Sequence, residues 1–103
     1  MTRATVSRNG TRFRLECRGH AGFAESGKDV VCAAVSAICQ TLLLWCQNTD
    51  TAAVRRAEIE PGHFLLEAEG KECAEPWKAA ALGLMSLQQG YPGHVQVRTD
   101  IFD

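Results

Sequence analysis

The sequence has no run of like charges long enough to form a binding surface by itself. Its 103 residues include 11 Lys or Arg and 12 Asp or Glu, scattered along the chain, and the formal net charge is −1. The best basic groups are Arg55-Arg56 and the pair Arg12 and Arg14, which share one face of an expected strand. Neither group is long enough to follow a phosphate backbone, so we expect no direct binding of nucleic acid.

Signal-peptide and membrane-span features are also missing. The longest uncharged stretch, residues 30–48, lies in the middle of the chain and is therefore not a secretory signal. Four polar residues interrupt it, which makes it a poor membrane span: Ser36, Gln40, Thr41 and Gln47. The sequence predicts a cytoplasmic protein without a membrane partner.

Five cysteines, at positions 17, 32, 39, 46 and 73, cannot all pair within one chain. Without a secretory signal, free thiols in a reducing compartment are expected. Cys32, Cys39 and Cys46 recur every seven residues, but seven helical residues rise about 10.5 Å. Two zinc-bound thiolates lie within about 4 Å of each other. We therefore expect no metal site and no cofactor, and we assign Cys17, Cys39, Cys46 and Cys73 to the core or to an interface.

The chain has no internal repeat and no linker, and its length fits one domain, residues 1–103. Short-range patterns predict the order ββαββαβ, and Asn9-Gly10 is expected to join the first two strands as a hairpin. The class is α+β, a sandwich with two helices packed on one mostly antiparallel sheet. The predicted strands are 5–8, 11–18, 54–60, 64–68 and one that starts at Val95, and the predicted helices are 29–47 and a second from about Pro76 to Gly90.

The first helix has an expected apolar face formed by Val31, Val35, Ile38, Leu42 and Trp45. It carries no charged residue after its first position, and the second helix carries almost none after Lys78. A surface helix normally has a charged face. We therefore expect the outer faces of the helices to meet a second copy of the chain in a homodimer.

The residues that carry chemistry lie at the start of the first helix. If Asp29 caps this helix, Cys32 lies in its first turn, where free N–H groups and the helix dipole favour a thiolate. His20 follows the second strand, after Gly19, and is a candidate base for the thiol. Ser36 lies one turn beyond Cys32 on the same stripe. The N–H groups at this helix end could hold an oxyanion.

A nucleotide-binding alternative rests on Gly22-x-x-x-x-Gly27-Lys28, a near match to a phosphate loop. Asp29 stands where that motif needs Ser or Thr, and its carboxylate would repel phosphate. A non-catalytic ribosome-associated binding module is a second alternative. Spacing alone also permits simpler roles, with Asp29 as a cap and Ser36 bonded to its own helix.

The segment from Gly19 to Ser36, GHAGFAESGKDVVCAAVS, resembles the signature of the ribosomal-processing cysteine protease family Prp. Residues 83–97 are similar to a second block of that family, and elsewhere the likeness is architectural. The sequence departs from the pattern at Ser26, where many relatives have an aromatic residue. It also has Cys39, Trp45 and Cys46 as additions and an individual turn at 61–64.

The resemblance implies a cytoplasmic, dimeric endopeptidase that removes an N-terminal extension from a large-subunit ribosomal protein. It implies that Cys32 and His20 form the catalytic dyad, supported by Asp29 and Ser36, and we add Gly19 to this supporting set. We expect the loop with Gly22, Phe23, Gly27 and Lys28 to contact the substrate, to be mobile in the free protein, and to order when substrate binds.

Overall fold

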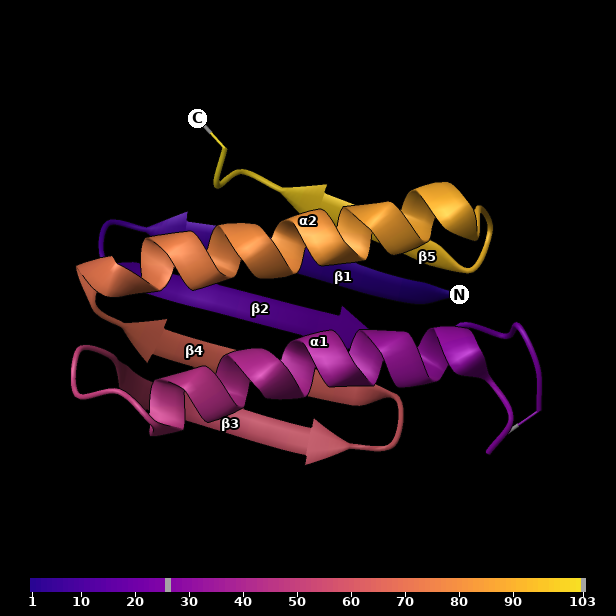
Figure 1. Ribbon diagram of the computed structural model, residues 1–103, viewed down its shortest axis with the longest axis horizontal. Helices are drawn as coiled ribbons and strands as arrows, with labels where there is room; N and C mark the ends of the chain where they lie inside the picture. The colour runs from indigo at the N-terminus through magenta and orange to yellow at the C-terminus, as the bar shows by residue number, and fades with distance from the viewer. Residues whose placement is uncertain (26, 103) are drawn as a thin grey trace.

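The computed structural model describes residues 1–25 and 27–102, and within them five strands and two helices follow the predicted order (Figure 1). A short 3₁₀ turn, Lys71–Cys73, precedes the second helix. This helix begins at Ala74, and Pro76 therefore lies in its first turn, as expected. The elements are β1 (Thr2–Asn9), β2 (Arg12–Arg18), α1 (Val30–Gln47), β3 (Ala53–Glu60), β4 (His63–Glu69), α2 (Ala74–Gly90) and β5 (Val95–Thr99).

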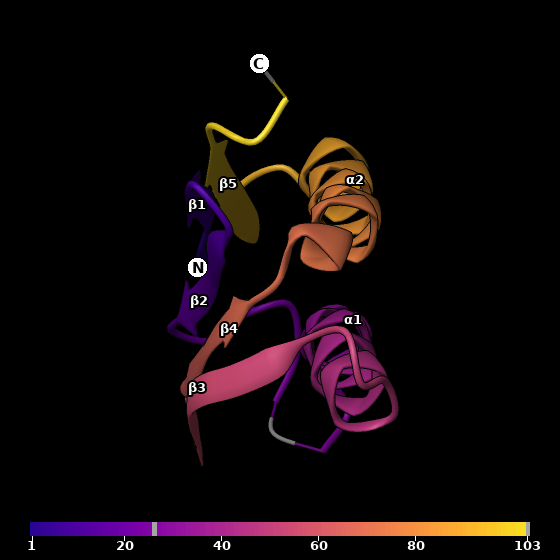
Figure 2. The same ribbon diagram turned by 90° about the vertical axis from the view of Figure 1, so that its left-hand side faces the viewer.

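The strands form one sheet in the order β3-β4-β2-β1-β5. The pairs β1–β2, β2–β4 and β3–β4 are antiparallel, whereas β1 and β5 run parallel. Both helices lie on the same face of this sheet (Figure 2), which confirms the predicted α+β architecture. The long connection through α2 explains how β5 returns parallel to β1, because a parallel pair needs a crossover.

The β1–β2 turn lies one residue later than the sequence pattern indicates. Asn9 pairs with Arg12 and still belongs to the strand, so Gly10 and Thr11 form the two-residue turn. Gly10 has a φ of 62°, and no described residue other than glycine has a positive φ. A glycine at the first turn position is the requirement of a type II′ hairpin, which matches the twist of the strands.

The buried face of α1 is rotated slightly from the predicted stripe. Ile38 and Trp45 are half-buried at the edge of the core, whereas Cys39 and Cys46 are 1% and 3% exposed within it. The expectation that Cys17, Cys39, Cys46 and Cys73 are small apolar residues of the core is confirmed, since all four are buried. The full buried face of α1 is Val31, Val35, Cys39, Leu42, Leu43 and Cys46.

α1 is also apolar enough to cross a membrane by length and composition alone, with a mean hydropathy of 1.8 over its 18 residues. The polar residues Ser36, Gln40, Thr41 and Gln47 were expected to make this segment a poor membrane span, but they do not lower its mean hydropathy enough to do so. In this fold the buried face of the helix packs on the sheet, and a core helix passes the same test.

Candidate active site

Asp29 caps α1, as the sequence predicts. Its Oδ1 accepts hydrogen bonds from the N–H groups of Val31 and Cys32, both at 3.0 Å, and its backbone carbonyl accepts from Ala33 at 3.1 Å. These N–H groups are among those that were expected, from the sequence, to bind an oxyanion. While the cap is in place, Val31 and Cys32 do not offer these N–H groups to an oxyanion, and a role for the other N–H groups of this helix end stays a prediction.

The second oxygen of Asp29 connects the helix to the preceding loop. Oδ2 accepts from the N–H groups of Phe23 at 2.9 Å and Ala24 at 3.2 Å. The pKa of Asp29 lies below its ordinary value, first because of the bond from Cys32, which outweighs an opposing desolvation effect. The bonds from the loop lower this pKa further. One carboxylate thus fixes the start of α1 and the loop that leads to it.

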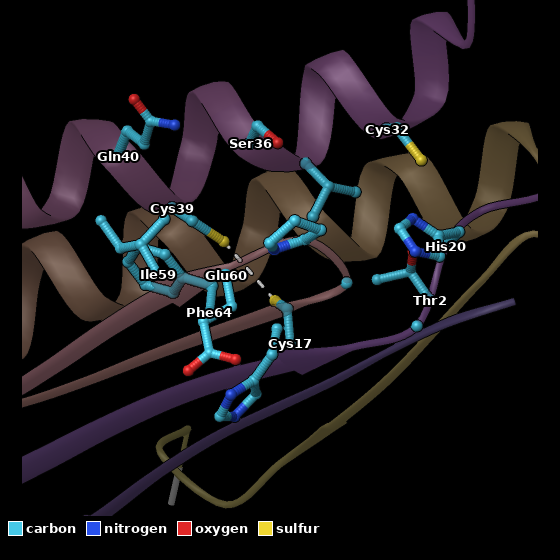
Figure 3. A pocket seen from close by; sticks show the side chains of 15 residues that line it. Thr2, Cys17, His20, Cys32, Ser36, Cys39, Gln40, Ile59, Glu60 and Phe64 are labelled. Atoms are coloured by element: carbon cyan, nitrogen blue, oxygen red, sulfur yellow. Dashed lines mark hydrogen bonds between the residues drawn. The ribbon is translucent and has the colours of Figure 1, made fainter. Parts of the chain in front are cut away.

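Cys32 is half-buried in the first turn of α1. The backbone N–H of Ala21 donates to its Sγ at 3.2 Å. An N–H directed at sulfur stabilises a thiolate more than a thiol, because a hydrogen bond to the charged form is the stronger one. In Figure 3 the sulfur points from α1 toward the ring of His20.

His20 lies two residues after the end of β2, and two glycines fix where it lies. Gly19 has a φ of 91°, its N–H donates to the carbonyl of Gly62 at 2.8 Å, and a Cβ on it would lie 2.5 Å from the carbonyl oxygen of Met1. Gly62, in the β3–β4 turn, packs against the ring, since a Cβ there would lie 2.9 Å from His20 Nε2. A side chain at position 19 would collide with the backbone of Met1, and one at position 62 would displace the ring of His20.

Two clefts meet at Cys32. The first, of about 240 Å³, runs between α1 and the β3–β4 turn (Figure 3). The second, of about 530 Å³, lies under the loop before α1. His20, Cys32 and Ser36 line both clefts. A substrate peptide bound in extended form across the sulfur would therefore place the residues before the scissile bond in one cleft and those after it in the other.

The first cleft has an apolar floor and a polar rim. Its deep side is formed by buried core residues, including Cys17, Val35, Cys39 and Phe64. Gln40 and Glu60 stand at the exposed edge. Such a cleft favours an apolar side chain with a polar backbone on either side of it.

Ser36 is exposed on α1 one turn after Cys32 and faces the clefts (Figure 3). Within the described residues its hydroxyl makes no hydrogen bond to the preceding helical turn, in contrast to Thr41, which donates to the Ala37 carbonyl at 2.6 Å. Ser36 is thus available to a bound peptide.

The predicted substrate loop divides into two parts. Gly22 and Gly27, with φ of 68° and 84°, line the second cleft. Phe23 and Lys28 line neither cleft: Phe23 packs edge-on against Tyr91 and His94, and Lys28 forms an ion pair with Glu25 at 3.0 Å. Ser26, the departure from the family pattern, lies outside the described residues.

The sequence argument missed two contributors to this site. Pro61-Gly62 was recognised as a turn, but nothing local showed that this turn lies beside His20. No sequence pattern singled out His94, yet its Nδ1 lies 2.9 Å from the Ala21 carbonyl, 73 positions away in the chain.

The other thiols differ from Cys32 in their surroundings. Cys39 Sγ lies 3.5 Å from Cys17 Sγ, and this hydrogen bond together with burial raises the pKa of Cys39. Burial and the neighbouring Cys73 raise the pKa of Cys46 to about 11. Burial also raises the pKa of Cys73. In residues 1–25 and 27–102, no three His, Cys, Asp or Glu side chains are grouped as metal ligands.

The geometry argues against the phosphate-loop alternative. Asp29 occupies the N–H groups of Val31 and Cys32 that a phosphate would need. The preceding strand, β2, is antiparallel to both of its neighbours rather than part of a parallel βαβ unit.

Comparison with known proteins identifies the family. The family model described as "Cysteine protease Prp" matches residues 1–96. The ribosomal processing cysteine protease Prp of Mycoplasma pneumoniae is 30% identical over 92 residues, covering 89% of this chain and 88% of that protein. The corresponding Mycoplasma genitalium protein is 28% identical over 89 residues, covering 86% and 90%.

A solved structure supports the same fold. The ribosomal processing protease Prp from S. aureus, in complex with a covalently linked product peptide, superposes with a TM-score of 0.84 at 18% identity. The match covers 97% of this chain and all of that one. With the family model spanning nearly the whole chain, this protein belongs to the Prp family of cysteine proteases.

Proposed function

We propose that Cys32 is the nucleophile and His20 the general base of this cysteine protease. The observation that carries the proposal is the meeting of two clefts at Cys32, with its sulfur directed toward His20. Cys32 is also the half-buried cysteine, whereas the other four are buried. Within the described residues no carboxylate hydrogen-bonds the His20 ring, so the pair acts as a dyad.

The reaction follows from this arrangement. His20 takes the thiol proton, and the thiolate attacks the carbonyl carbon of the bound peptide. The C–N bond breaks, His20 returns the proton to the leaving amine, and a thioester remains on Cys32. Water, deprotonated by His20, then attacks the thioester and releases the new carboxyl terminus and the free thiol.

We propose as substrate the N-terminal extension of a large-subunit ribosomal protein, cleaved in the cytoplasm. Relatives named ribosomal processing cysteine proteases support this choice. The apolar floor of the first cleft fits an apolar residue near the cut bond.

The experiment is incubation of the purified protein with the full-length ribosomal protein of the same organism, followed by mass spectrometry of its N-terminus. We expect one cut, lost in Cys32→Ala and in His20→Ala, and retained in the core variant Cys46→Ala. Cleavage that persists in Cys32→Ala, or is lost in Cys46→Ala with the fold intact, would contradict the assignment.

We propose further that the chain is a homodimer joined through the outer surface of α1 and α2. Large apolar side chains are exposed there: Val30 at 58%, Leu44 and Leu82 at 56%, and Met85 at 39%. Between the helices runs an apolar groove of about 340 Å³, lined by Ile38, Trp45 and Pro76 among others. Exposed apolar surface of this kind is typical of a protein–protein interface.

Sedimentation at several micromolar concentrations tests the assembly. We expect a dimer for the native chain and a monomer for Leu82→Glu. Val54→Glu places the same charge at an exposed apolar position on β3 and should leave the dimer intact. A monomeric native chain at every concentration would contradict the proposal.

A further inference from the structure

His94 connects the C-terminal part of the chain to the reactive cysteine through two consecutive hydrogen bonds. Its Nδ1 lies 2.9 Å from the carbonyl oxygen of Ala21, which it reaches as a donor because a carbonyl cannot donate. The N–H of the same residue, Ala21, donates to Cys32 Sγ at 3.2 Å. Ala21 is 1% exposed, so water does not replace either contact easily.

The backbone of His94 is itself held in place. Its N–H donates to the Tyr91 carbonyl at 3.0 Å, and its carbonyl accepts from the N–H of Thr2 at 3.0 Å. The ring is also in contact with Phe23, with centroids 5.4 Å apart at 83°, and Phe23 packs on Tyr91 in the same edge-on manner at 5.3 Å. The α2–β5 connection thus provides a fixed platform for the loop.

We propose that His94 is a positioning residue that holds the Ala21 N–H on Cys32 Sγ and thereby sets the reactivity of the thiol. Asp29 does not hold the backbone at Ala21, because its carboxylate binds the N–H groups of Phe23 and Ala24 instead. The Ala21 carbonyl and the Ala21 N–H belong to adjacent peptide groups that share the Ala21 Cα. Without the His94 contact, the backbone can rotate about this Cα, and the N–H that faces the sulfur is lost.

The same N–H is well placed for the later step. Asp29 occupies the N–H groups of Val31 and Cys32, and the Ala21 N–H is the backbone donor bonded to the sulfur in the described part of the chain. When the sulfur bonds to the carbonyl carbon, negative charge moves to an oxygen two bonds from Sγ, within reach of this donor. His94 then acts on the rate of bond cleavage more than on peptide binding.

Two substitutions separate the hydrogen bond from the ring contact. His94→Phe keeps an aromatic ring against Phe23 but has no donor, whereas His94→Asn keeps a donor near the position of Nδ1 and has no ring. Gln88→Ala is the matched control: Gln88, near the end of α2, accepts from the N–H of Val97 in β5 at 2.6 Å. It makes no contact with the loop among the described hydrogen bonds.

The measurements are the rate of Cys32 alkylation by iodoacetamide, and kcat and KM for cleavage of the ribosomal protein, with thermal unfolding as a check of the fold. We expect His94→Phe to lower both the alkylation rate and kcat about fivefold, the effect of one net hydrogen bond, with KM unchanged. His94→Asn should restore most of this loss, and Gln88→Ala should change neither rate.

Equal rates in the native chain and His94→Phe would overturn the inference, and so would equal losses in His94→Phe and His94→Asn. The inference rests on Cys32 being the reactive thiol, but alkylation needs no peptide substrate. If alkylation shows the expected pattern while the ribosomal protein is not cut, the proposed substrate fails and the role of His94 stands.

Discussion

The contact between Gly62 and His20 allows a sharp test of the dyad. Gly62 has a φ of 73°, and an added Cβ would lie 2.9 Å from His20 Nε2, where ordinary contacts begin at 3.4 Å. In Gly62→Ala the ring must therefore retreat by about 0.5 Å. A misplacement of about 1 Å at a reacting group can cost about a hundredfold in rate, so we expect kcat to fall about tenfold.

Gly10→Ala is the matched control for this experiment. Gly10 has a φ of 62°, close to that of Gly62, and an added Cβ there meets nothing within 4 Å. Both substitutions place alanine in the left-handed region at a cost of about 1–2 kcal/mol. For a domain of this size each kcal/mol lowers Tm by about 4–8 °C. The two variants should thus lose similar stability, while only Gly62→Ala loses kcat.

The assay combines thermal unfolding, cleavage of the ribosomal protein and alkylation of Cys32. Alkylation of Cys32 does not require His20 to pass a proton to a leaving amine. The alkylation rate should therefore fall less than kcat in Gly62→Ala. A Gly62→Ala enzyme with the kcat of Gly10→Ala and the same loss of Tm would contradict this prediction. It would mean that the His20 ring does not need the position that the β3–β4 turn gives it.

Three further predictions follow from the site. At pH 8 one thiol should react quickly with iodoacetamide, and mass spectrometry should locate it at Cys32. Cys46, with a pKa of about 11, is only about one part in a thousand thiolate at that pH. Fast labelling of Cys46 in the folded protein would contradict this prediction. Because the pKa of Asp29 is lowered in the folded protein, its carboxylate stabilises the fold above the unfolded pKa, and this stabilisation is lost as the pH falls through the folded pKa. Acid titration below about pH 4 should therefore destabilise the native chain more steeply than Asp29→Asn. Parallel unfolding curves for the two proteins would show that the carboxylate charge does not matter. Hydrogen exchange at Gly22 and Gly27, which line the second cleft, should be faster in free Cys32→Ala protein than with bound substrate peptide. Equal exchange at saturation would show that this part of the loop does not respond to the substrate.

The local features of this site follow from residues close together in the sequence. Asp29 is a cap because a short acidic side chain before an apolar helix satisfies its first N–H groups, and this places Cys32 in the first turn. The order of strands and helices also follows from short-range periodicity. These features depend on residues only a few positions apart.

Which distant residues meet at the site depends on the tertiary structure. The order β3-β4-β2-β1-β5 brings the β3–β4 turn to the end of β2, and so sets Gly62 against the ring of His20. The parallel pairing of β1 with β5 brings His94 to Ala21. Strand order and register depend on how the whole sheet buries its apolar face under the two helices, and no local pattern in the chain encodes that choice.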